Sequence, residues 1–293
     1  MIPKWPRACK SDFFNMNYEL IDSGEGRRLE KWGGYLLDRP DPQIIWKKSL
    51  SPEEWEKVDA YFKRISEDKG IWDIKTKIPE KWELAHSDVK FFAKLSPFKH
   101  TGIFPEQSTQ WDYIYEKVKA EKREVKVLNL FAYTGIASLF AAKAGASVTH
   151  VDASRPAVTW ANENRALNDE NWPIRWIIDD AIKFTAREIK RGVKYDAIIM
   201  DPPAYGHGPT GEVWDFNSDF PKLLTNCKEL LSENPLFVII NAYAISSSSI
   251  TLANTLNDYF GKLGGGIENG ELTLKESSGG RLLSTGIWAR WSK

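Results

Sequence analysis

The stretch VKVLNLFAYTG, residues 125–135, decides the fold that this sequence predicts. Residues 125–131 form a short apolar run, which is typical of a buried parallel strand, and the small residues of 134–144 predict a helix directly after it. Gly135 stands where the loop enters that helix, where backbone can approach a ligand and N–H groups are free. An ordinary tight turn would read the same way. The run lacks the second glycine of the GxGxxG pattern, which weighs against a dinucleotide cofactor.

Outward from this stretch, the chain alternates strands with helices. Four more strands are expected, at 147–151, 174–178, 195–200 and 236–241. Four more helices are expected, at 156–167, 181–191, 220–231 and 250–260. Residues 272–274 and 283–291 predict a closing antiparallel pair. Such repeated units predict an α/β fold, a Rossmann-like doubly wound sheet with helices on both faces, whose ligands bind beyond the carboxyl ends of the strands.

The first hundred residues have a different pattern and predict a small β-rich domain, residues 1–100, in front of the Rossmann-like domain, residues 101–293. Turn signals divide its sequence into short strands. Ser51 as N-cap and Pro52 at the first helical position predict one helix. Four residues then fall on one face of that helix: Trp55, Val58, Tyr61 and Phe62. Further strands are expected at 82–84 and 89–95.

The composition indicates a folded chain with a sizeable core. The 293 residues suggest about two domains, and 42% hydrophobic with 27% charged residues excludes a disordered or collagen-like chain. Because 40 basic residues balance 40 acidic ones, a strongly basic nucleic-acid coat is disfavoured, although a local basic face is not. The 13 tryptophans are expected mainly to fill the core rather than to stack bases.

Cysteines and histidines predict no metal. Cys9 and Cys227 are too few for a cysteine-rich zinc site, and the four histidines (86, 100, 150 and 207) show no ligand spacing. No apolar run reaches the roughly 18 residues of a membrane helix, and the N-terminus has no signal-peptide core. We therefore expect a cytoplasmic protein with no membrane partner. The oligomeric state cannot be read from the sequence.

Acidic residues follow two of the expected strands. Asp152 stands about 20 residues after the first loop, the spacing of an acid that binds the ribose hydroxyls of a nucleoside cofactor. Its alternative role is to cap the next helix, but Ser154, followed by proline, could cap that helix alone. Of Asp179 and Asp180, one is expected to cap a helix and the other to reach an adenine amino group.

The most specific signal is Asp201-Pro202-Pro203-Ala204-Tyr205-Gly206, directly after an apolar strand. Two prolines stiffen the backbone, and their missing N–H groups predict outward carbonyls without local partners. Asp201 and these carbonyls could accept hydrogen bonds from a flat, nitrogen-bearing substrate on which Tyr205 stacks. The alternative is a bare Asp-Pro-Pro turn.

Residues 95–293 resemble the class I S-adenosylmethionine-dependent methyltransferases, and within them the large-subunit ribosomal RNA methyltransferases with an Asp-Pro-Pro-x-aromatic motif. The resemblance rests on residues 129–135, 151–154, Asn164 with 167–168, Asp180 and 201–206, and on 101–107 as the segment that closes over the cofactor. It implies that Phe131 to Gly135 holds the methionine end, Asp152 the ribose and Asp180 the adenine, with Asp201 to Pro203 beside the transferable methyl. The cofactor-binding residues that we expect are Phe104, Gln107, Asn129, Phe131, Ala132, Tyr133, Thr134, Gly135, Asp152, Ala153, Ser154, Asp180, Ala181 and Asp201. The expected catalytic residues are Asp201, Pro202, Pro203 and Tyr205.

Some features of this sequence differ from that group and limit the reactions that we expect it to catalyse. The segment after the fifth strand, 240–246, has no cysteine, and Cys227 falls in an apolar helix stripe, so a covalent attack on a pyrimidine ring is excluded. The aromatic stands one place later than in many amino-group methyltransferases, which weakens an adenine-N6 assignment. Residues 1–100 do not match the usual RNA-binding module. The expected enzyme methylates nitrogen or oxygen, on RNA by first choice. A protein or small-molecule substrate, or a noncatalytic cofactor-binding module, is the alternative.

Two weaker signals adjoin this core. Five basic residues share one helix face and could grip phosphate or be merely solvated: Lys183, Arg187, Lys190, Arg191 and Lys194. The glycine-rich stretch 206–211 could form a lid over the site, with His207 touching substrate and 212–214 above it.

Overall fold

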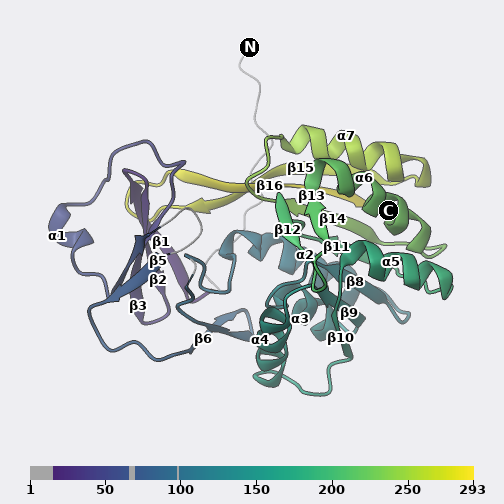
Figure 1. The fold of residues 1–293 in the computed structure, drawn as a ribbon, viewed down its shortest axis with the longest axis horizontal. Coiled ribbons are helices and arrows are strands. Elements are labelled where there is room, and N and C mark those ends of the chain that lie inside the picture. The colour runs from purple at the N-terminus through teal and green to yellow at the C-terminus, as the bar shows by residue number, and fades with distance from the viewer. Residues whose placement is uncertain (1–15, 66–69, 98) are drawn as a thin grey trace, which may run out of the picture.

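The computed structural model describes residues 16–65, 70–97 and 99–293 and has two lobes (Figure 1). The first lobe is a five-stranded sheet in the order β1-β2-β3-β4-β5, antiparallel except between β3 and β4. Its strands are β1 (Tyr18–Gly24), β2 (Arg27–Trp32), β3 (Tyr35–Pro40), β4 (Ala60–Arg64) and β5 (Gly70–Ile74). A β-rich N-terminal region is therefore present. Cys9 lies outside the described residues.

The helix expected after Ser51 is real but short. Helix α1 (Pro52–Trp55) begins with Ser51 as its N-cap and Pro52 at its first position, as predicted. The expectation that Val58, Tyr61 and Phe62 continue it is wrong, because the helix ends at Trp55 and Tyr61 and Phe62 lie in strand β4. Between the helix and this strand, the side chain of Asp59 accepts the N–H of Leu36 at 2.7 Å, which fixes the chain beside the sheet.

The second lobe contains a seven-stranded sheet in the order β10-β9-β8-β11-β14-β16-β15. The first five of these strands are parallel, and β16 and β15 are antiparallel. Its strands are β8 (Lys126–Leu130), β9 (Ser147–Asp152), β10 (Ile174–Ile178), β11 (Ala197–Met200), β14 (Phe237–Ala242), β15 (Gly266–Lys275) and β16 (Leu282–Ser292). Strand order reverses between β8 and β11, which makes their carboxyl ends the expected ligand site. The predicted doubly wound sheet is confirmed.

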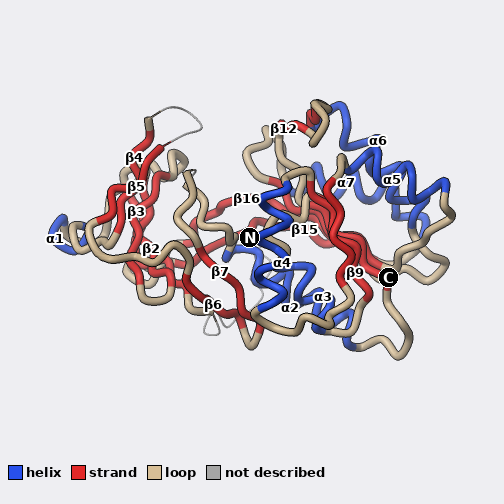
Figure 2. The backbone as a smooth tube through the Cα atoms, turned by 60° about the horizontal axis from the view of Figure 1, so that its bottom comes forward, coloured by secondary structure: helices blue, strands red, loops and turns tan. Residues whose placement is uncertain are grey.

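Helices cover both faces of this sheet (Figure 2). They are α2 (Ser108–Lys119), α3 (Ile136–Lys143) and α4 (Arg155–Ala166) on one face, and α5 (Ala181–Lys190), α6 (Phe216–Leu230) and α7 (Ser249–Phe260) on the other. Neighbouring strand residues alternate between the two cores: Val127 packs with the α2 and α3 side, and Leu128 with the α5 to α7 side. This two-sided burial explains why the strands are continuous apolar runs.

Two hairpins join the lobes. The first, β6 (Trp82–His86) with β7 (Val89–Ala93), lies on α4, where Asn164 accepts the N–H of Phe92 and Asn168 bonds both backbone groups of Lys90. The second, β15–β16, is predicted correctly but is longer than expected and extends into the first lobe (Figure 1). Its far end packs on Leu20. Residues of this hairpin, from beyond position 265, thus complete a lobe that begins near position 16.

Candidate active site

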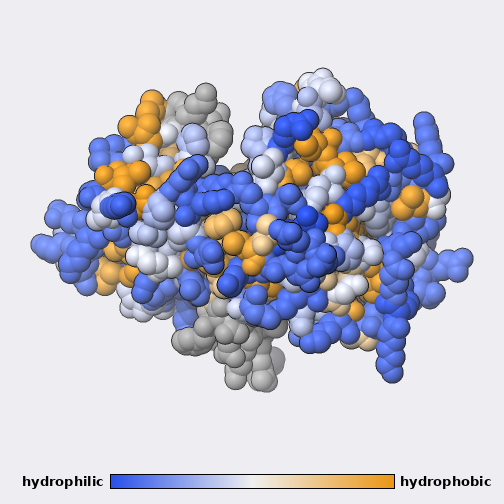
Figure 3. All heavy atoms as spheres, turned by 90° about the horizontal axis from the view of Figure 1, so that it is seen from below, coloured by the Kyte–Doolittle hydropathy of each residue, from blue (hydrophilic) through white to orange (hydrophobic). Residues whose placement is uncertain are grey.

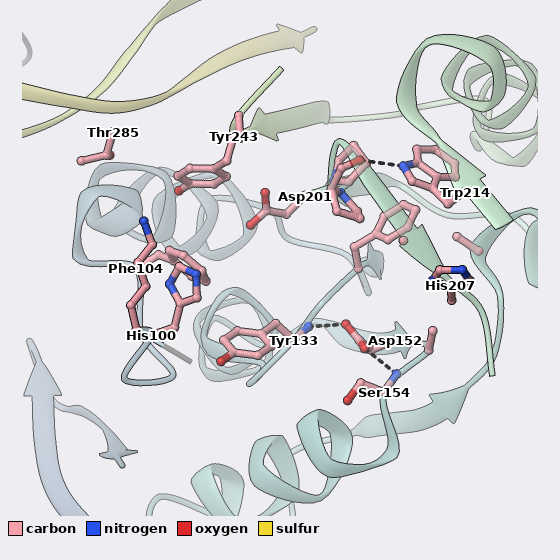
Figure 4. A pocket seen from close by; sticks show the side chains of 18 of the residues that line it. His100, Phe104, Tyr133, Asp152, Ser154, Asp201, His207, Trp214, Tyr243 and Thr285 are labelled. Carbon is pink, nitrogen blue, oxygen red and sulfur yellow. Dashed lines mark hydrogen bonds between the residues drawn. The ribbon is translucent and has the colours of Figure 1, made fainter. Parts of the chain in front are cut away.

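A cleft of about 830 Å³ lies at the carboxyl ends of the sheet, between the two lobes. Figure 3 shows the notch between the lobes on one face of the molecule, and Figure 4 shows the interior of the cleft. Most of its walls are loops that follow β8, β9, β10, β11 and β14, together with the segment before α2. A volume of this size is typical of small-molecule and cofactor sites.

The loop after β8 has a strained backbone. Phe131 and Tyr133 have positive φ angles of 53° and 48°, and Gly135 has 82° as the residue before α3. Positive φ in non-glycine residues costs about 1–3 kcal/mol each and is concentrated at functional sites. A Cβ at Gly135 would lie 2.9 Å from the Cβ of Ala161, so the glycine allows both the turn and the close contact with α4. The expected tight glycine loop is present.

Asp152, at the end of β9, holds this loop. Its Oδ2 accepts the N–H of Tyr133 and its Oδ1 accepts the N–H of Ser154, both at 2.8 Å (Figure 4). Burial raises the pKa of its carboxyl group, and the two backbone bonds oppose that shift. The hydroxyl of Ser154 caps α4 by accepting the N–H of Ala157. Asp152 and the neighbouring Ala153 therefore remain facing the cleft.

After β10, the two acids divide their roles. Asp180 caps α5 by accepting the N–H of Lys183 at 2.8 Å, whereas Asp179 forms an ion pair with Arg187. Both acids and Ala181 line the cleft. The structure thus assigns the capping role that the sequence left open between the two acids.

Asp201 follows β11 and projects into the centre of the cleft (Figure 4). Its Oδ2 accepts the Nε2 amide of Gln107 at 2.7 Å, and the same amide donates to the hydroxyl of Tyr243 at 3.0 Å. Removal from water raises the pKa of Asp201 to about 7; the carboxylates of Glu106 and Asp152 add to the shift, and the Gln107 bond opposes it. Asp201 is therefore poised to change its protonation near neutral pH.

The residues of the Asp-Pro-Pro-x-aromatic motif differ in their contacts and in whether they line the cleft. Pro202 and Pro203 line the cleft. The expectation that the proline carbonyls have no local partner is wrong for Pro203, whose carbonyl accepts the indole N–H of Trp214 at 2.7 Å. Tyr205 is 58% exposed and packs edge-on against His207, and it is not among the residues that line the cleft. Trp214 takes the inner position, with its ring 4.8 Å from that of Phe131.

The glycine-rich stretch forms an ordered hairpin, β12 (Tyr205–His207) with β13 (Val213–Asp215). It places His207 and Trp214 in the cleft wall (Figure 4). The position of Trp214 beside the site agrees with the sequence expectation for residues 212–214.

The segment before α2 forms the opposite wall. The ring of Phe104 lies 5.8 Å from that of Tyr133 and 5.3 Å from that of Tyr243. The hydroxyl of Thr134 donates to the carbonyl of Gly102 and ties this segment to the β8 loop. A second, smaller hollow of about 40 Å³ adjoins the same loop and is lined by Gln107, Asn129, Ala132, Thr134 and Gly135, among others. The Asn129 amide itself is used internally, donating to Ser138.

Several cleft residues are not predicted by the sequence patterns. Tyr243 lies in the segment after β14, which is notable in the sequence only for its lack of a cysteine. The rule that ligands bind at the carboxyl ends of strands could have identified this residue. Residues of the first lobe also line the cleft, among them Arg28, Gln43 and Lys99. The sequence carries no signal for these, because only the packing of the two lobes brings them there.

The surroundings of Cys227 and of the basic face of α5 favour structural roles for both. Cys227 is fully buried in α6, as its apolar stripe predicted. On α5, Lys183, Arg187 and Arg191 pair with acids of the same chain, which favours the solvated, internally paired interpretation of the basic face. Within the described ranges, no cluster of three or more potential metal ligands occurs. No described helix is long and apolar enough to cross a membrane.

Comparison with known proteins identifies the class. The family described as S-adenosylmethionine-dependent methyltransferase matches residues 60–258, and the chain belongs to this family. A solved S-adenosylmethionine-dependent methyltransferase from Agrobacterium tumefaciens is 41% identical with a TM-score of 0.91, covering 94% of this chain and 90% of that one. A putative methyltransferase solved in complex with SAH shares the fold at 19% identity and a TM-score of 0.71, covering 94% of this chain and 76% of that one.

A curated relative is the ribosomal RNA large subunit methyltransferase K/L of Alteromonas mediterranea. It is 35% identical over 164 residues, which are 55% of this chain and 22% of that protein. The chain thus matches only about a fifth of the length of this relative. The resemblance to class I methyltransferases seen in the sequence is confirmed.

The cleft fits S-adenosylmethionine, the cofactor of the family. Its volume accepts a ligand of that size. An acid stands at the end of β9, where nucleoside cofactors place their ribose, and Gly135 opens the N-terminus of α3. Phe104 and Tyr133 offer apolar ring surface on the opposite side.

Proposed function

We propose that this protein methylates RNA, with ribosomal RNA as the first candidate, at a nitrogen or oxygen atom. The observation that carries the proposal is Asp201, a carboxyl group with a pKa of about 7 at the centre of the cleft. Such a group accepts a proton or a hydrogen bond from an amine or hydroxyl at neutral pH. The named ribosomal RNA methyltransferase relative supports RNA as the substrate. An enzyme acting on bacterial-type ribosomal RNA works in the cytoplasm, which is our proposed location.

The site residues receive roles by position. Asp152 would accept the ribose hydroxyls, and the loop from Phe131 to Gly135 would hold the methionine end. Asp179, Asp180 and Ala181 would bound the adenine, with Asp180 doing so while it caps α5. Phe104 and Gln107 would close the cleft from the other wall, as the rings around Phe104 already do in part.

S-adenosylmethionine, when bound, supplies a methyl group on a positively charged sulfur. Asp201 would orient the acceptor and take the proton that its nitrogen or oxygen loses, as the new C–N or C–O bond forms and the C–S bond breaks. The Gln107 amide, held by Tyr243, fixes the carboxylate for this task. Alignment of this kind contributes up to about 7–11 kcal/mol in well-oriented systems. Pro202, Pro203 and Trp214 would form the stiff wall against a flat acceptor.

The test is a transfer assay with methyl-labelled S-adenosylmethionine and cell extract depleted of methylation. We expect label that ribonuclease releases and protease does not, and nucleoside analysis would then name the atom. Label that only protease releases would replace RNA by a protein substrate. Label in neither fraction, with cofactor binding intact, would contradict the proposal in favour of a small-molecule acceptor or a binding module.

A further inference from the structure

The first lobe contributes a polar wall to the cleft. Arg28 on β2 and Lys99 line the cleft together with Asp41 and Gln43. His100 adjoins them and packs against Phe104 (Figure 4). None of these residues belongs to the loops at the ends of the parallel strands, where the cofactor is expected. The wall therefore faces space that the cofactor role leaves unexplained.

Arg28 is held in this wall with a donor left over. Its side chain is 9% exposed and lies 3.8 Å from Glu30 and 3.4 Å from Asp41. Glu30 is already engaged by Arg39 through two bonds, at 2.5 and 2.7 Å. The 3.4 Å contact to Asp41 is made by Nε, whose N–H forms no hydrogen bond among the described residues. A buried donor whose hydrogen bond is not made is costly unless a ligand completes it.

Lys99 adds a second cation to this wall. Its backbone carbonyl accepts from Arg39, but its ammonium group forms no hydrogen bond or ion pair with any side chain in the described ranges. Burial lowers the pKa of Lys99, and the nearby charge of Arg28 lowers it further, whereas Asp41 acts in the opposite direction. His100 stays neutral because burial and the same cations lower its pKa to about 3. Glu30, Asp41 and Glu106 supply counter-charge to Arg28, so the ammonium group of Lys99 is the cation of this wall that an incoming anion can pair with directly.

We propose that Arg28 and Lys99 form an anion site that takes a phosphate group of the substrate. The identification of the anion as an RNA phosphate rests on the proposed function. A planar guanidinium fork and an ammonium group are the usual phosphate-binding pair. A phosphate beside the target nucleotide, held at the first lobe, leaves the base free to reach Asp201. The first lobe is then part of the substrate site rather than a support for the second.

Three variants test the site. Lys99→Ala removes one cation, and Arg28→Lys keeps charge but loses the fork. Lys31→Ala is the matched control, because Lys31 is an exposed lysine on the same strand as Arg28. Binding of S-adenosylhomocysteine, measured by calorimetry, checks that each variant is folded.

The readout is the affinity for unmodified, in vitro transcribed large-subunit ribosomal RNA over a salt series. Loss of one phosphate contact weakens binding roughly tenfold at low salt and reduces the slope of log K against log salt by about 0.7–0.9. We expect this for Lys99→Ala and not for Lys31→Ala. Equal affinities and equal slopes for the wild type, Lys99→Ala and Arg28→Lys would overturn the anion site. If the wild type still binds the RNA in that case, the proposed function is unaffected.

A second arm separates the two proposals. If the wild-type protein does not bind the RNA, inorganic phosphate is titrated against it. Binding of phosphate that Lys99→Ala abolishes supports the anion site on a smaller phosphorylated substrate and overturns RNA as the substrate. Absence of phosphate binding in that case overturns the site as well.

Discussion

Replacement of Asp201 by asparagine should both stabilise the folded protein and abolish most of its catalytic activity. The pKa of Asp201 is raised from 3.8 to about 7, mainly by removal from water. Between these two pH values the folded chain holds a proton that the unfolded chain releases, so stability falls as pH rises through this window. Raising the pKa of this group from 3.8 to about 7 corresponds to about 4 kcal/mol. Because the side chain faces a cleft that water enters, we expect about half of that, about 2 kcal/mol.

Asp201→Asn keeps the shape and still offers an oxygen to the Gln107 amide, which donates at 2.7 Å. At pH 8 the variant should therefore be about 2 kcal/mol more stable than the wild type, and the difference should shrink steadily as the pH falls and vanish only below 3.8, where the carboxyl group of the unfolded wild type is protonated as well. Turnover should fall by about 10²–10⁴, the contribution of a positioned proton acceptor. Affinity for S-adenosylhomocysteine should change little.

The assay is urea unfolding followed by tryptophan fluorescence at pH 5, 6, 7 and 8 without cofactor, with equal m-values as the check on two-state behaviour. Asp258→Asn, at an exposed position on α7, is the control for removing a charge. A stability difference that does not vary with pH would refute the raised pKa. Unchanged turnover would refute the role of Asp201 as acceptor.

Three further predictions concern the same cleft. Asp152→Ala should raise the Kd for S-adenosylmethionine roughly 10- to 100-fold, since charged hydrogen bonds contribute about 1.5–3 kcal/mol; equal affinities in calorimetry would refute the ribose role. Gly135→Ala should cost about 2–4 kcal/mol in thermal or urea unfolding, because its φ of 82° and the 2.9 Å contact with Ala161 both resist a side chain. Gly145→Ala, with a φ of 103° but nothing within 4 Å, should cost only about 1–2 kcal/mol, and equal losses would contradict the steric argument. Trp214→Phe keeps the ring against Phe131 but loses the bond to the Pro203 carbonyl, so we expect about 1 kcal/mol lower stability and reduced turnover with cofactor affinity retained; an unchanged turnover number would show that this bond does not serve the acceptor wall.

The core sheet is predictable because each of its parallel strands is short, apolar and followed by a loop. Val127 and Leu128 show the reason: neighbouring residues are buried on opposite faces, so the whole strand must be apolar. The same pattern locates Asp152 and Asp201 at strand ends from the sequence alone. Local chemistry suffices here because each βα unit carries its own signals.

The first lobe is less predictable, and residues 58–62 show why. Val58, Ala60 and Phe62 are buried, and the residues between them are less so, which is the two-residue period of a strand. The strong helix start at Ser51 masks that period. The cleft residues Arg28 and Lys99 depend on how the lobes pack, which no local pattern encodes.

Helix boundaries in the second lobe are also only partly predictable. Helix α6 starts at Phe216, earlier than the expected residue 220, because Asp215 caps it. Pro221 stands inside this helix, beyond its first turn, so its missing N–H leaves the carbonyl of Asn217 without its intrahelical partner. A proline in the sequence therefore does not by itself mark where this helix begins.

The long hairpin β15–β16 imposes an order on the synthesis of the molecule. Asp22, buried in the first lobe, is held partly by Ser278 and Arg281, partners that lie 256 and 259 residues later in the chain. A ribosome therefore releases the first lobe long before it releases the residues that complete it. Contacts of such separation form late and slowly. During synthesis, the lobe that emerges first stays incomplete until the hairpin is made.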